Sequence, residues 1–141
     1  QHLAGRVQHA AAAASGRLGF QHDQIVLEYG YDDDVAEEFR ELVETTVGGP
    51  LEPEDYTGVV DAVLLWWRDG DGDLTDELVD CLALLEDGGF VALVTPATGR
   101  SGRVMAHDIQ EACATAGLTA SGAVPVGDDG AWHAQRLVGR R

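Results

Sequence analysis

The first residues suited to chemistry follow a short β-rich run at positions 24–29. Glu28 and Gly30 place an acid and a glycine at its end, as in loops that bring backbone close to a nucleotide cofactor. Tyr31 and Asp32, followed by two more aspartates, stand where such loops carry further glycines. These carboxylates would repel an anionic ligand at a helix N-terminus. The pattern therefore favours a capped, solvated helix start over a site for adenosylmethionine or a dinucleotide.

The aspartates of a second acidic segment have the spacing of ligands in a metal-binding loop. Asp69, Asp71 and Asp73 match the 1, 3, 5 positions of a calcium loop, and Asp80 falls at position 12. Position 6 is Leu74, where such loops need glycine, and a strand rather than a helix is expected to precede it. We therefore expect at most weak divalent-cation binding, shared with the aspartates at 32–34 because both segments should reach one sheet edge.

Two adjacent tryptophans, Trp66 and Trp67, end the most apolar run of the chain, residues 59–67. Adjacent strand residues face opposite sides of a sheet, so one ring would pack under each layer of helices. Core packing of both rings is the simpler interpretation. The alternative is that one ring forms a stacking wall for a flat ligand or a partner, with Arg68 beside it.

Positive charge is concentrated in one loop, residues 97–103. Arg100 and Arg103 alternate there with glycines that permit a close backbone approach, so they could hold a carboxylate or phosphate. Pairing with the acidic loops nearby is the simpler interpretation. No Ser-His-Asp or Cys-His order indicates nucleophilic catalysis, and the histidines lack metal-ligand spacing. His107 would cap the last helix or line the same edge.

The elements that must position these residues alternate in type. A helix is predicted from Val35, capped by Asp34 with Glu37 in the reciprocal position and ended by Gly48. A second helix is capped by Asp73 and ended at residues 88–89. A third, short helix is ended by Gly117. The predicted strands are residues 24–29, 59–67, 90–94, 118–126 and 132–138, the last two joined across a glycine-rich turn.

This order predicts an α/β fold: a trimmed Rossmann-like sheet of about five strands, mostly parallel, with a C-terminal antiparallel hairpin and helices on both faces. The pattern is similar to class I methyltransferase domains that lack their second and third strands. The expected strand order is 1-2-3-5-4. Residues 31–34, 66–73 and 95–103 each follow a parallel strand, so they should converge at the carboxyl edge of the sheet.

Composition restricts the function classes. The chain has 141 residues, 45% of them apolar, and a net charge of −16 from nine arginines, no lysine and twenty-five acids. Such a charge disfavours direct binding to nucleic acid or anionic membranes, and no apolar run could span a bilayer. Cys81 and Cys113 are predicted to be buried free thiols, as in a cytoplasmic protein. Residues 1–17 are expected to form a loose arm and residues 18–141 a single domain.

Several sequence blocks resemble a family of small, acidic, uncharacterised actinobacterial proteins. The more specific blocks are G-Y-D-D-D at 30–34 and W-R-D-x-D-G-D-L at 67–74, and the likeness runs from about residue 17 to 138. The chain departs from the family's Trp-Ser-Gly-Thr-Arg-Leu-Val block at 132–138, where His133, Ala134 and Gln135 replace the small polar residues. The resemblance implies a fold but no activity.

Together these features favour a non-catalytic cytoplasmic module that binds a protein partner or a small polar ligand at the acidic carboxyl edge. The alternative is a small divergent enzyme, methyltransferase-like or acting on a metabolite. A third possibility, from charge alone, is an acidic mimic that competes for a basic nucleic-acid-binding protein. The candidate binding residues are Glu28, Gly30, Tyr31, Asp32, Trp66, Trp67, Arg68, Arg100 and Arg103.

Overall fold

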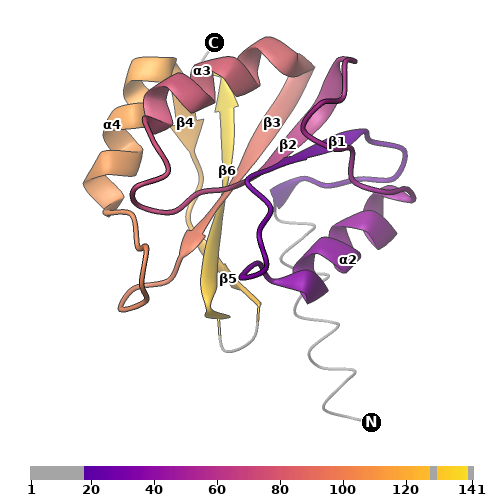
Figure 1. Cartoon of the computed structure of the whole chain (residues 1–141). Helices are drawn as coiled ribbons and strands as arrows, with labels where there is room; N and C mark the ends of the chain where they lie inside the picture. The colour runs from indigo at the N-terminus through magenta and orange to yellow at the C-terminus, as the bar shows by residue number, and fades with distance from the viewer. Residues whose placement is uncertain (1–17, 128–129, 140–141) are drawn as a thin grey trace, which may run out of the picture.

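The computed structural model describes residues 18–127 and 130–139, which form one mixed sheet with helices on both faces (Figure 1). Helix α2 lies on one side of the sheet, and α3 and α4 lie on the other. The helices are α2 (Glu37–Val47), α3 (Leu74–Leu84) and α4 (Ala106–Ala116). The strands are β1 (Val26–Tyr29), β2 (Val60–Trp66), β3 (Leu85–Pro96), β4 (Leu118–Ala120), β5 (Val124–Val126) and β6 (Trp132–Gly139).

The strand order confirms the predicted fold class. The sheet runs β1-β2-β3-β6-β4, with β5 also paired to β6. Strands β1, β2 and β3 are parallel, whereas β6 is antiparallel to β3, β4 and β5. The predicted strand at 118–126 is wrong in one respect, because it divides into β4 and β5. Between them, the backbone amide of Arg136 donates to the Ser121 hydroxyl. In a continuous strand this amide would donate to a backbone carbonyl instead.

Alternation along β2 divides the core into two halves. Leu64 and Trp66 point to the α2 side, and Leu65 and Trp67 point to the α3 and α4 side. Strand β3 repeats the pattern, so both faces of the central strands are covered. Cys81 and Cys113 are buried free thiols on the α3 and α4 side, as predicted.

Two predicted helix boundaries need correction. Helix α2 begins after Ala36 without a side-chain cap, because the Asp34 carboxylate is bound by Arg68 and Glu37 binds Arg40 and Tyr31 instead. Asp73 caps α3 as predicted, but the helix ends at Leu84 rather than at residues 88–89.

The physical reason for the early end of α3 is strand pairing. Leu85 is already extended and pairs with Val60 of β2, so the two glycines lie inside β3. A Cβ at Gly89 would lie 2.8 Å from the Asp61 carbonyl oxygen, which explains why glycine is needed there. Gly48 and Gly117 end their helices in the left-handed conformation, as expected.

The predicted loose arm, residues 1–17, lies outside the described residues. Across residues 18–127 and 130–139, each helix is too short or too polar to cross a bilayer.

Candidate functional site

Arg68 joins the loops that follow the three parallel strands. Its guanidinium donates to the Asp34 carboxylate at 2.6 and 3.0 Å and to the Gly30 carbonyl oxygen at 2.9 Å. The next residue, Asp69, donates its amide to the Gly102 carbonyl at 2.8 Å. The loops after β1, β2 and β3 therefore lie together at the carboxyl edge of the sheet.

The environment of Arg68 is that of a structural cation. Its side chain is 17% exposed, lies 5.3 Å over the Trp132 ring and also approaches the Asp71 carboxylate at 3.6 Å. The hydrogen bonds from Arg68 hold the pKa of Asp34 below its usual value, and that carboxylate in turn raises the pKa of Arg68. We call Arg68 and its partners Asp34, Gly30, Asp71 and Trp132 the Arg68 cluster.

Glu28 is the centre of a second polar network beside the Arg68 cluster. Its carboxylate is 7% exposed and accepts from Arg40 Nε at 2.5 Å, from Arg40 Nη2 at 2.7 Å, and from Trp66 Nε1 at 2.8 Å. Arg40 also pairs with Glu37 at 2.8 Å and lies 4.5 Å over the Tyr31 ring. Burial of Glu28 is thus compensated by charge and hydrogen bonds, as a buried carboxylate requires.

The backbone of Gly30 is engaged on both sides. Its amide donates to the Glu54 carboxylate at 3.0 Å, and its carbonyl accepts from Arg68. Its φ is +82°, and a Cβ there would lie 2.2 Å from the Trp66 carbonyl oxygen. Glycine is therefore required because this turn packs against the end of β2.

Both tryptophans are core residues. Trp66 is 0% exposed and packs edge-on against Phe39 and Trp132, with ring centroids 6.4 and 5.1 Å apart. Trp67 is 6% exposed and belongs to the opposite half of the core. The simpler of the two predicted interpretations, core packing, accounts for both positions.

The three aspartates predicted as weak metal ligands have separate roles in the fold. Asp71 accepts from the Arg68 amide at 2.9 Å, Asp73 caps α3, and Asp69 is exposed. Among residues 18–127 and 130–139, one set of three ligand-type residues has its ligand atoms within 4.8 Å of one another. That set is Asp32, Asp33 and Asp34, whose last member is already paired with Arg68.

Arg100 and Arg103 are exposed in the turn after β3. Neither forms an ion pair with any residue that the structure describes, and the single side-chain contact of Arg103 is with Met105 Sδ at 3.7 Å. Arg68 and Arg40 thus form the ion pairs that were predicted for the loop arginines. Arg100 and Arg103 form none with the residues that the structure describes.

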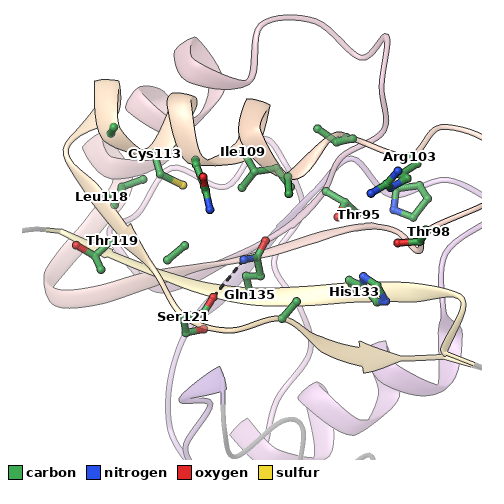
Figure 2. A pocket seen from close by; sticks show the side chains of 17 residues that line it. Thr95, Thr98, Arg103, Ile109, Cys113, Leu118, Thr119, Ser121, His133 and Gln135 are labelled. Carbon is green, nitrogen blue, oxygen red and sulfur yellow. Dashed lines mark hydrogen bonds between the residues drawn. The ribbon is translucent and has the colours of Figure 1, made fainter.

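A cavity of about 470 Å³ lies beside Arg103, between α4 and the β4 and β6 strands (Figure 2). We call it the α4 cavity. None of the seventeen residues lining it is acidic, although the chain carries twenty-five acids. Arg103, Thr98 and His133 lie toward one end, and Cys113 and Leu118 lie toward the other.

Sequence reasoning found Arg103 but missed the rest of this cavity. Thr95, His133 and Gln135 come together because β6 lies antiparallel to β3, with Thr95 opposite His133. The alternation of residues along β6 could have indicated two of them, because it turns His133 and Gln135 to the same side of the sheet as Leu137. Burial raises the pKa of the Cys113 thiol, so this cysteine lines the cavity as an apolar group.

Comparison with known proteins identifies the family. Residues 15–141 match the family described as "Protein of unknown function (DUF3052)". The chain belongs to the DUF3052 family. An uncharacterised protein of Mycobacterium tuberculosis strain H37Rv is 46% identical over 122 residues, which are 86% of this chain and 75% of the relative.

Solved structures with the same fold are methyltransferase-like. The pyocyanin biosynthetic protein PhzM aligns with a TM-score of 0.65 at 10% identity, over 93% of this chain and 54% of that chain. A precorrin-6y C5,15-methyltransferase from Geobacter metallireducens aligns with a TM-score of 0.62 at 11% identity, over 92% and 87%. Fibrillarin of Aeropyrum pernix, in complex with natively bound S-adenosyl-L-methionine, gives 0.58 at 16%, over 91% and 72%. At these identities the likeness concerns the fold.

Fibrillarin, one of these structures of similar fold, holds S-adenosyl-L-methionine, a ligand that the DUF3052 chain would have to receive at the end of β1. Ligands of open α/β sheets bind outside the carboxyl ends of the strands, where glycine-rich backbone is free to receive them. Here the amide and the carbonyl of Gly30 are both taken by side chains, and Arg68 spans the space from the β1 loop to Trp132. As arranged, these residues do not fit the cofactor.

Proposed function

We propose that this DUF3052 protein is a non-catalytic cytoplasmic module that binds a small polar ligand or a protein partner at the carboxyl edge of a methyltransferase-like fold. The observation that carries the proposal is the Arg68 cluster, which satisfies the backbone and the charges of the β1 loop from within the chain. Recognition is assigned to Arg100 and Arg103, which are exposed and unpaired within the described residues.

The experiment replaces both loop arginines. The Arg100→Ala, Arg103→Ala double variant should keep the fold and lose the partner or ligand that the wild-type protein retains from a cell extract at low salt. Retention should also fall at high salt, because exposed charges are screened. Binding that survives both changes would contradict recognition by these arginines. A variant in which Glu38, an exposed acid of α2, is changed to Gln serves as the matched surface control.

A divergent methyltransferase is the second candidate. It is favoured by Glu28 and Gly30, which keep an acid and a glycine at the end of β1, and by the methyltransferases among the structures of similar fold. For this function adenosylmethionine would have to displace Arg68 from the Gly30 carbonyl. Arg68→Ala would then strengthen cofactor binding, whereas the binding-module proposal expects no cofactor binding in either protein.

A further inference from the structure

We propose that the α4 cavity is a binding site for a small organic carboxylate with a hydrocarbon body. This inference rests on the proposed function, because it names the ligand class and the place where Arg103 would act. It rests on three properties of the cavity: its charge, a threonine hydroxyl without a protein partner, and an apolar wall along α4 and β4.

The charge of the lining selects an anion. Arg103 is the one residue of the lining with a permanent charge, and no lining residue is acidic. Two other cavities at the described surface do carry acids: Asp69, Asp73 and Asp108 in one, and Glu86 and Asp87 in the other. In a chain with a net charge of −16, an anion would therefore meet less repulsion from the lining of the α4 cavity than from either of these two.

Thr95 adds a polar group without a protein partner. The residue is 4% exposed and lines the cavity, yet its hydroxyl makes no hydrogen bond to any residue that the structure describes. Among the described residues, Arg136 Nε is the buried side-chain polar atom without a partner, so the Thr95 hydroxyl is accessible from the cavity and can meet a ligand oxygen. His133, opposite Thr95 on β6, and Thr98 offer further polar groups at the same end.

The opposite end of the cavity suits a hydrocarbon body. Ile109, Cys113 and Leu118 form an apolar wall there, with Thr119 and Ser121 at the same end, and the Gln135 amide nitrogen donates to the Ser121 carbonyl at 3.1 Å. Figure 2 shows Ile109 between the Arg103 end and the Cys113 end. An elongated ligand would thus place its carboxylate at Arg103, whose planar guanidinium matches two carboxylate oxygens, and its chain along α4.

Amide chemical-shift titration of the full chain by NMR tests this assignment, with hexanoate as the probe. Hexanoate should give saturable shifts at Thr95, Thr98, Ile109 and Cys113. Acetate, which lacks four of the methylenes, should bind on the order of a hundredfold more weakly, because each buried methylene contributes to affinity. Hexanol and hexylamine, which lack the negative charge, should not saturate.

Four variants locate the interaction. Arg103→Ala should weaken hexanoate binding about tenfold or more, and Arg103→Lys should restore part of it, because lysine keeps the charge without the planar fork. Thr95→Val should weaken binding severalfold without unfolding, since no protein group uses the hydroxyl. Glu38→Gln is the matched control, because Glu38 is exposed on α2, does not line the cavity and should leave the affinity unchanged.

Three results would overturn the assignment: no saturable shifts up to about 10 mM hexanoate, equal binding of hexylamine, or equal loss in Glu38→Gln. The failure of this inference is distinct from that of the proposed function. If hexanoate does not bind but the double arginine variant still loses its partner, only the cavity assignment fails. If adenosylmethionine binds at Gly30, the proposed function fails whatever hexanoate does.

Discussion

The Arg68 cluster and the Arg103 end of the α4 cavity lie at the same carboxyl edge but use their polar groups in opposite ways. In the cluster, Arg68 has carboxylate, carbonyl and aromatic partners supplied by three segments of the chain. In the cavity, Arg103 and the Thr95 hydroxyl have no such partners among the described residues. Satisfied polar groups stabilise a fold, whereas unsatisfied ones at a cavity are available to a ligand.

This difference explains why the position of a loop is a poor guide to its role. Glu28, Gly30 and Arg68 stand where an open α/β sheet would bind a ligand, yet they bind one another. The segment with fewer internal contacts, beside α4, retains the free donors. The following experiments weaken one region at a time.

The largest effect is expected from Arg40→Ala, which leaves the Glu28 carboxylate buried without its cation. Removing one partner of a buried pair costs about 3–5 kcal/mol of unfolding free energy. Urea denaturation measures it. Glu37→Gln is the control, since it removes only the exposed partner of Arg40 and should change the midpoint little. Equal effects of the two substitutions would show that the Glu28 network is not structural.

Arg68→Ala should destabilise less, by roughly 1–2 kcal/mol, because Asp34 is half exposed and can be solvated. Its pH dependence has a definite sign. The folded pKa of Asp34 is lowered by Arg68, so the pair stabilises the protein above the ordinary carboxyl pKa and loses this contribution as the pH falls through the lowered value. The difference in melting temperature between wild type and variant should therefore shrink in acid. A constant difference would exclude the Asp34 pairing as its cause.

Glu77→Gln should stabilise the protein slightly at neutral pH, by roughly 0.5 kcal/mol or less. Burial, together with Asp80 and Glu54, raises the pKa of Glu77 in the folded state. A raised carboxyl pKa favours the unfolded state once the group ionises, so the gain should disappear as the pH falls through that pKa. Thermal melts at several pH values measure it, and destabilisation at neutral pH would contradict the account.

The smallest effect on stability is expected from the double variant Arg100→Ala, Arg103→Ala. Both side chains are exposed and unpaired within the described residues, so the unfolding free energy should stay within about 0.5 kcal/mol of wild type. A loss comparable to that of Arg68→Ala would show that these arginines support the fold, and the contrast between the two regions would fail.

The fold was predictable because its signals are local. The apolar run at 59–67 required a strand covered on both faces, and Gly48 and Gly117 ended helices through their own backbone conformation. The end of α3 was not predictable in this way, because the pairing of Leu85 with Val60 is a tertiary contact that overrides the two glycines after it.

For the candidate site, the sequence predicted only that three loops meet at the carboxyl edge of the sheet, not which side chains contact one another there. Asp34 is a good helix cap by type, and its capture by Arg68, 34 positions away, depends on the packing of β1 against β2. The α4 cavity depends on the break between β4 and β5 and on the antiparallel register of β6. Thr95, His133 and Gln135 form no sequence motif that would have indicated it.

The most direct test of the central claim is calorimetric titration of the wild-type protein with adenosylmethionine at neutral pH. If the Arg68 cluster satisfies the β1 loop from within, no saturable heat of binding should appear up to about 1 mM cofactor. One-to-one binding that is lost on changing Gly30 to Ala would contradict the claim and identify a methyltransferase-type site.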